Sequence, residues 1–289
     1  MSIIEKVNGT AAGKQRTVKQ RGLPISVLAS VLWIGFIVLV AVFADQIAPY
    51  HYTALDLPNR LVAPLRSKHL LGTDELGRDI LSRLIVSVRV SALVALGATL
   101  ISACFGTTMG FAAAHFRGRI GQLILMLADF QAAMPFLILS LSVLAFFGNA
   151  LPLFIGLMGL YGWERYARIA RGLAVAASAQ GYAGAVRQLG ASPQWVYLRH
   201  ILPNISSTLI VSMTLTFPEI ILMESSLSFL GLGVQPPMTS LGNMVGYGRE
   251  YMTSAPWIMF APALLIVTTT LAISLLGDWL RDRLDKGLQ

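Results

Sequence analysis

The stretch GAVRQLGASPQWVYLRHILPN, residues 184–204, interrupts the apolar character of this chain of 289 residues. It contains Arg187, Arg199, His200 and two prolines, and long apolar runs lie on either side of it. Over the whole chain, 55% of residues are hydrophobic, 12% are charged and the mean hydropathy is +0.67. This composition predicts an all-α integral membrane protein that crosses the bilayer several times.

Six apolar stretches are long enough to cross a bilayer, because about 20 helical residues at 1.5 Å each cover a hydrocarbon core of about 30 Å. They run roughly over residues 24–44, 88–114, 121–147, 150–172, 205–231 and 256–277. Gly148, Asn149 and Pro152 predict a tight turn between the third and the fourth. The first follows a basic tail, residues 1–23, and is too long for the core of a cleaved signal peptide, so we expect a retained anchor helix.

The basic residues predict the orientation in the membrane. Six spans place both termini on one side, and most of the 22 Lys and Arg residues fall on that side. By the positive-inside rule, the tails at residues 1–23 and 278–289 are therefore expected in the cytoplasm. The stretch 184–204 would share that side with them.

Two loops are expected outside. The first, residues 45–87, ends in KHLLGTDELGRDILSRL (Lys68–Leu84), which predicts a turn followed by a short interfacial helix capped by Thr73 or Asp74. For this segment both a structural cap and a substrate-facing surface stay open. The second loop, residues 231–257, has several helix breakers, so irregular backbone at the edge of the bilayer is expected.

Several kinds of chemistry have no signal in the sequence. There is no G-x-x-x-x-G-K-[ST] motif, so we expect no ATP site on this chain, and no nucleophile motif that would make it an enzyme. The four histidines lie far apart, so no metal site is expected. No basic run is interleaved with aromatic residues, which argues against nucleic acid as a partner. The single cysteine, Cys104, is expected to be a packed thiol.

Charged residues inside the predicted spans are candidate functional residues. Asp129, Glu219 and Glu224 each put a carboxylate where lipid would penalise it, so each is expected to line a pathway or to make a structural contact. For Asp129, about ten residues after Arg119, the structural alternative is a cap on a neighbouring helix or a pair with an arginine of the loop. For Glu224, an interhelical hydrogen bond is favoured over substrate contact. Pro135 and Pro218 are expected to kink their helices.

The stretch 184–204 itself has the pattern of two helices joined by a glycine. Residues 178–189 can form the first helix, and Gly190 is well placed to terminate it. Ser192 can then cap a second helix that begins at Pro193 and is expected to end at Pro203. Such a unit would project from the membrane, with Tyr182 available for packing and Arg187 for contact with a partner.

This two-helix stretch resembles the cytoplasmic coupling motif of ABC importer permeases. The motif has Glu-Ala-Ala, three residues, Gly, a spacer of nine or ten residues and a closing Ile-x-Leu-Pro or similar. Ala185 matches the first alanine, Gly190 the glycine, and residues 201–203 the closing run. The strings HLLGTDELGRDILSRL, SLSFLGLGVQPP, GNM, SAPW and LLGDWLRDRLD, in this order, resemble the C-type permeases of dipeptide, oligopeptide and nickel importers.

The resemblance implies a type I ABC importer transmembrane fold, with a core of five helices over residues 88–277 after the anchor helix. It implies that a cytoplasmic coupling loop, about residues 173–204, docks onto an ATPase subunit. The coupling residues it implies are Tyr182, Gly184, Ala185, Arg187, Gly190, Ala191, Ile201, Leu202 and Pro203. The implied partners in the bacterial inner membrane are a B-type permease and two ATPase subunits that bind ATP and Mg, together with a periplasmic solute-binding protein.

Several alternatives for the transported solute and the energy source stay open. Small peptides are favoured, and nickel chelates, glutathione or oligosaccharides are the alternatives within the same class of importer. A secondary transporter that uses the intramembrane carboxylates as ion sites is the alternative from another class.

The sequence departs from the coupling motif at Gly184, where the motif has its glutamate, and at Val186, where it has its second alanine. No acid occurs between Glu164 and Glu219, whereas Arg187 lies in the middle of the coupling loop. We therefore predict that Arg187→Glu lowers the substrate-stimulated ATPase activity of the assembled complex, because Arg187 would meet an acidic groove on the ATPase. Unchanged activity would contradict this electrostatic contact.

Overall fold

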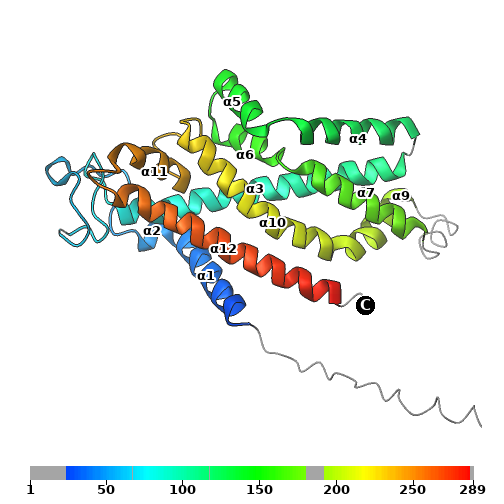
Figure 1. The fold of residues 1–289 in the computed structure, drawn as a ribbon, viewed down its shortest axis with the longest axis horizontal. Coiled ribbons are helices and arrows are strands. Elements are labelled where there is room, and N and C mark those ends of the chain that lie inside the picture. The colour runs from blue at the N-terminus through cyan, green and yellow to red at the C-terminus, as the bar shows by residue number, and fades with distance from the viewer. Residues whose placement is uncertain (1–23, 67, 117, 180–191, 287–289) are drawn as a thin grey trace, which may run out of the picture.

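The computed structural model describes residues 24–66, 68–116, 118–179 and 192–286, and within these ranges it is helical and contains no strand (Figure 1). The longer helices are α1 (Ile25–Val42), α3 (Ile80–His115), α4 (Gly118–Ala133), α5 (Phe136–Phe147), α6 (Leu151–Gly159), α7 (Trp163–Ala179), α10 (Leu202–Phe229), α11 (Leu241–Gly248) and α12 (Trp257–Lys286). The short ones are α2 (Ala44–Ile47), η1 (Leu57–Asn59), α9 (Pro193–Val196), η2 (Tyr197–Ile201) and η3 (Arg249–Tyr251). The all-α prediction is confirmed.

Four helical stretches in the described residues are long and apolar enough to cross a membrane. They are α1, α3, the continuous run Pro193–Phe229, and Trp257–Leu284 of α12. A fifth span is formed if α4 and α5 are counted together, although these two helices meet at an angle of 89°. The bend falls at Pro135, as predicted, because proline has no backbone N–H and disfavours helical backbone in the residue before it.

The predicted count of six spans is not confirmed, because the expected span 150–172 is divided into α6 and α7. Gly162 adopts a left-handed φ of +76° in the turn between them. At 1.5 Å per residue the nine residues of α6 reach only about 14 Å, less than half of the hydrocarbon thickness. α7 carries Glu164, Arg165, Arg168 and Arg171, which make it too polar to count as an apolar span.

Helix α3 is the central element of the bundle and contacts α1, α4, α6, α7, α10, α11 and α12 along its length (Figure 1). Its closest neighbour is α7, which it approaches at two glycines one turn apart. A Cβ atom added at Gly110 would lie 2.5 Å from the carbonyl oxygen of Ala167 and 2.8 Å from Cβ of Ala170. A Cβ atom at Gly106 would collide with the backbone of Trp163. Small residues therefore set this interhelical distance, as is usual between helices in lipid.

The second half of the predicted two-helix unit differs from the prediction at its end. Ser192 caps the helix as expected, with its side chain accepting from the Trp195 N–H at 3.4 Å, and Pro193 is the first helical residue. Pro203, however, does not end the helix, since α9, η2 and α10 form one run from Pro193 to Phe229. The turn before Pro203 is a π-turn, in which Leu202 donates to the carbonyl of Tyr197. This wider turn accommodates a residue that has no N–H of its own to donate.

The two predicted external loops, together with α2, α11 and η3, gather at the end of the bundle opposite the C-terminal end (Figure 1). The prediction of Thr73 or Asp74 as a cap for a short helix is wrong. Asp79 caps α3 instead, and the helix continues directly into the span. The second loop is not wholly irregular either, because Ser240 caps α11 by accepting from the Asn243 N–H at 3.1 Å.

Two other boundaries differ from those expected. Helix α3 begins at Ile80, within the segment 45–87 that was expected to be a loop, and α12 continues through most of the predicted tail 278–289, as far as Lys286. Residues 173–179 of the predicted coupling loop form the end of α7, and residues 180–191 lie outside the described residues.

We predict that Gly110→Ala lowers the thermal stability of the purified protein, because the added methyl group forces α3 away from α7. The expected loss is about 1–3 kcal/mol, the usual cost of overpacking a tight contact. The midpoint of thermal unfolding in detergent measures it. Gly35→Ala in α1 is the matched control, since a Cβ atom there would have no neighbour within 4 Å. Equal midpoints for the two variants would contradict the role given to Gly110.

Candidate functional site

Three of the nine predicted coupling residues lie in the described part of the chain. Ile201 is fully buried, Leu202 is partly buried and Pro203 is exposed. The first two pack against α3 and α7, in an apolar cluster that includes Tyr166, Ala170 and other α7 residues. The other six, Tyr182, Gly184, Ala185, Arg187, Gly190 and Ala191, lie outside the described residues.

Aromatic contacts hold the beginning of the long helix against the end of α3. Tyr197 lies with its ring centroid 5.1 Å from that of Phe111 and 5.9 Å from that of His115. A groove of about 490 Å³ runs between these two elements, and Gln194 and Leu198 line its other side. The closing part of the predicted coupling loop is thus attached to the end of α3, the central helix of the bundle.

The three intramembrane acids make different contacts. Asp129 of α4 lies 3.4 Å from a guanidinium nitrogen of Arg168, and Glu219 of α10 lies 3.1 Å from one of Arg165. Both arginines belong to α7, so each pair connects α7 to a neighbouring helix.

Glu224 is buried in the interior of the bundle, where it accepts hydrogen bonds from serine hydroxyls. Ser240 donates to it at 2.7 Å and Ser228 at 2.8 Å. Ser91 of α3 donates to its other oxygen at 3.5 Å. The expected interhelical hydrogen bond is therefore present, and it ties α10 to α3 and to the beginning of α11.

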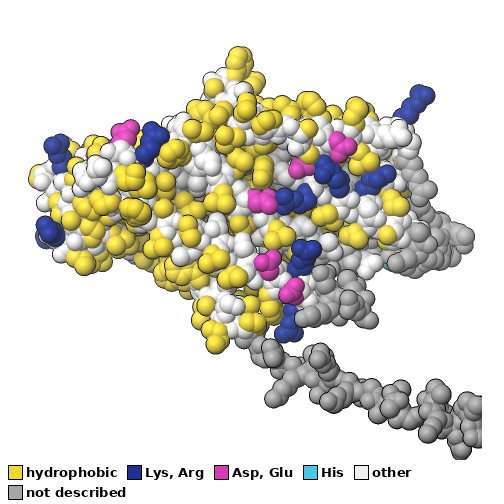
Figure 2. Space-filling model, viewed as in Figure 1, with side chains coloured by type: hydrophobic (Ala, Val, Ile, Leu, Met, Phe, Trp, Pro, Cys, Tyr) yellow, Lys and Arg dark blue, Asp and Glu magenta, His cyan; other side chains and the backbone are white. Residues whose placement is uncertain are grey.

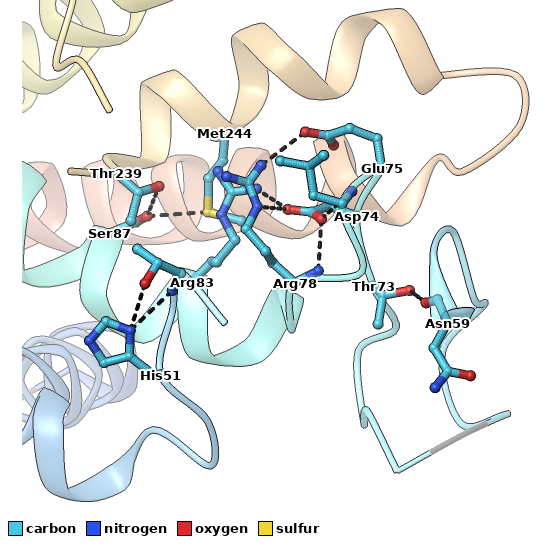
Figure 3. A network of polar contacts seen from close by, with 12 residues as sticks. His51, Asn59, Thr73, Asp74, Glu75, Arg78, Arg83, Ser87, Thr239 and Met244 are labelled. Atoms are coloured by element: carbon cyan, nitrogen blue, oxygen red, sulfur yellow. Dashed lines mark hydrogen bonds and ion pairs between the residues drawn. The ribbon is translucent and has the colours of Figure 1, made fainter. Parts of the chain in front are cut away.

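A second polar network lies in the loop before α3 (Figure 3). Asp74 is fully buried and accepts from the N–H groups of Leu76 and Arg78, both at 2.9 Å. The guanidinium groups of Arg78 and Arg83 also donate to it. Both carboxylate oxygens of Asp74 thus accept hydrogen bonds from donors in the loop or in α3. This supports the interpretation of the segment Lys68–Leu84 as a structural cap.

The described ranges contain no evident metal site, and Cys104 is a free thiol. No group of three or more His, Cys, Asp or Glu side chains there is placed to bind a metal ion. Cys104 is exposed on α3, so the prediction of a packed thiol is wrong. Its side chain points out of the bundle because the small residues beside it, Ser102 and Ala103, occupy the buried face.

Comparison with known proteins identifies the family. Residues 106–289 match the family described as the inner membrane component of binding-protein-dependent transport systems. This chain belongs to that family. The resemblance recognised in the sequence is therefore confirmed.

Individual relatives match over nearly the whole chain. The chain is 37% identical to the di/tripeptide transport system permease protein DppC of Pseudomonas aeruginosa, over 91% of this chain and 88% of that protein. It is 34% identical to the oligopeptide transport system permease protein OppC of Bacillus subtilis, over 91% and 86%. It is 33% identical to the glutathione transport system permease protein GsiD of Pectobacterium atrosepticum, over 91% and 87%. The chain is an ABC transporter permease.

Among solved structures, an inward-facing form of the MetNI methionine ABC transporter matches with a TM-score of 0.49 and 20% sequence identity. The match covers 68% of this chain and 95% of that chain.

Arg165 and Arg168 were not identified from the sequence as partners of the acids, and the arginine that pairs with Asp129 lies on α7 and not in the loop before α4. The spacing of three residues between these two arginines was the available signal, because it places them on one face of a helix. Ser228, four residues after Glu224, offered the same local signal, whereas Ser91 and Ser240 could not be found this way because they are far from Glu224 in sequence.

We predict that Glu224→Leu destabilises the permease by about 2–4 kcal/mol, because it leaves the buried Ser240 and Ser228 hydroxyls without their acceptor. Glu224→Gln is expected to cost less, since one side-chain oxygen remains. The thermal midpoint in detergent gives the comparison. Ser226→Ala is the control, because that exposed hydroxyl donates only to the carbonyl of Leu222 in its own helix. Equal loss in the leucine and alanine variants would contradict the role of Glu224.

Proposed function

We propose that this permease imports small peptides across the bacterial inner membrane. The observation that carries the proposal is the identity of 34–37% to permeases of di/tripeptide and oligopeptide systems, over about nine-tenths of the chain. Glutathione is a second candidate, because a glutathione permease is 33% identical over a similar length. Glutathione is itself a tripeptide derivative, so one pathway could accept both kinds of solute.

The proposed complex contains a second, B-type permease, two ATPase subunits and a periplasmic solute-binding protein. ATP and Mg would bind to the ATPase subunits, and this chain would bind no cofactor and no nucleic acid. The absence of a phosphate-binding motif from this sequence supports the assignment of ATP binding to the ATPase subunits. Both termini would lie in the cytoplasm, which the distribution of Lys and Arg supports.

The coupling loop, about residues 173–204, would receive the movement of the ATPase. Its last residues lie in the helix that continues to Phe229, so a displacement of this end is applied to a helix that contacts α3, α7, α11 and α12. The burial of Ile201 against α7 supports the same role, since α7 contains residues 173–179 of the same loop.

We predict that the complete complex, purified with its co-encoded partners and reconstituted in vesicles, takes up a labelled dipeptide when ATP is supplied on the ATPase side. Uptake should need the binding protein and should persist when an ionophore removes the ion gradients. The same complex supplied with a non-hydrolysable ATP analogue is the control, and it should show no uptake.

The competing outcomes are distinct in the same assay. Uptake of glutathione without uptake of dipeptides would replace the proposed substrate. Uptake that survives ATP depletion and stops with the ionophore would favour the secondary transporter.

A further inference from the structure

The ion pairs of α7 lie on a surface that is open in the single chain. The side chains of Arg165 and Glu219 are 44% and 36% exposed, and those of Arg168 and Asp129 are 47% and 72% exposed. In Figure 2 charged side chains gather over α7 and the adjoining part of α10, while large areas of the same face are hydrophobic. We call these two ion pairs, Arg165–Glu219 and Arg168–Asp129, the α7 charged face.

Glu219 sets the depth of the α7 charged face, because it is far from both ends of its helix. It is 17 residues after the first residue of α10 and 10 before its last, which correspond to about 25 Å and about 15 Å. Arg165, the third residue of α7, lies at the same level because it pairs with Glu219. Asp129 is 11 residues after the first residue of α4, about 16 Å, and four before its last, where α4 bends into α5. A charged side chain at such a depth costs about 2.5–3.5 kcal/mol against lipid. This face therefore meets water or another protein.

Other exposed surfaces of the bundle have the composition that suits lipid. The exposed side chains of α1 and α12 are large and apolar, among them Phe36, Leu264 and Leu271. The bundle thus has an apolar side at α1 and α12 and a charged side at α7.

Incomplete pairing within this chain favours a water-filled pathway over a sealed protein interface, in which a partner subunit would have to supply the missing donors. Charges buried between subunits are stable only when all their hydrogen bonds are made. Asp129 is instead largely exposed, with a single long contact. One oxygen of Glu219 accepts from Arg165, whereas Oε2, although shielded from solvent, has no hydrogen-bond partner in the described residues.

We propose that the α7 charged face lines the translocation pathway and binds the charged termini of a zwitterionic substrate in transit. This inference rests on the proposed function. Glu219, whose side chain is 36% exposed, binds the terminal ammonium group, and Arg165 and Arg168, 44% and 47% exposed, bind the terminal carboxylate. A free peptide carries a positive ammonium group and a negative carboxylate at its ends, and the two ion pairs of the α7 charged face offer a partner of opposite charge for each. Because the two pairs together have no net charge, they would not hold the peptide too tightly for release.

Accessibility to a water-soluble reagent tests where the face lies. In a Cys104→Ser background, Asp129→Cys in the reconstituted complex is expected to react with a charged, membrane-impermeant thiosulfonate and to be protected by dipeptide. Leu271→Cys, a lipid-side position 57% exposed in the single chain, is the matched control and should not react. Equal reactivity at both positions, or none at Asp129→Cys, would overturn the placement.

Selectivity between substrates tests the binding role. We expect Glu219→Gln to lower the uptake of a free dipeptide about tenfold or more, the loss of one charge-assisted hydrogen bond, through a higher KM. Uptake of the N-acetylated dipeptide, which has no ammonium group, should change little. Each variant is compared with the native complex on the same substrate, so any preference of the binding protein for one substrate affects both uptake rates equally and drops out of their ratio.

The exchanged pair, Arg165→Glu with Glu219→Arg, separates binding from structure. It should keep the thermal stability of the complex and still lose dipeptide uptake. Recovery of native uptake by the exchange, or an equal effect of Glu219→Gln on both substrates, would overturn the inference and leave the proposed function intact. A native complex that moves no peptide would instead contradict the proposed function.

Discussion

The arrangement of the bundle depends on how closely α3 and α7 approach each other. In lipid there is little hydrophobic force between helices, so association relies on packing, and packing requires small residues at the contact. Gly106 and Gly110 supply this on α3, and Ala167 and Ala170 supply it on α7. With α7 fixed, its opposite side is directed outward, which places Arg165 and Arg168 where α4 and α10 offer carboxylates.

Two kinds of polar contact coexist in this apolar chain and have different consequences. Glu224 and Asp74 are buried and well supplied with donors, so they stabilise the junctions at one end of the bundle. The pairs on α7 are exposed and incompletely satisfied. Burial with full hydrogen bonding is typical of structural groups, whereas open pairs at membrane depth are typical of functional ones.

Much of the fold could be predicted from the sequence, because long apolar runs and helix caps are local signals. The runs at α1, α3, α10 and α12 and the bend at Pro135 were predicted correctly. The division of residues 150–172 into two helices was missed, because the segment taken as a whole is apolar enough to predict a single span. Only the turn at Gly162 separates the short α6 from the charged α7. Pro203 was taken as a terminator because proline usually ends a helix, and a π-turn is not visible in the sequence.

The candidate site could be predicted only in part. The acids Asp129, Glu219 and Glu224 were identified because charge within an apolar run is conspicuous, but their partners depend on contacts between helices far apart in sequence. The family resemblance supplied the role of the coupling loop, and most of its motif residues lie outside the described ranges.

Pro218, immediately before Glu219, affects how the long helix responds to force. A proline inside a helix leaves the carbonyl four residues earlier, here that of Thr214, without its usual donor. From the π-turn to Thr214 the helix retains its regular bonding and is stiff along its axis. The helix bends most easily beside Glu219, whose carboxylate pairs with Arg165. A displacement applied near Ile201 would therefore change the angle of the helix at Glu219. The helix would then act as a stiff segment with a hinge at that residue.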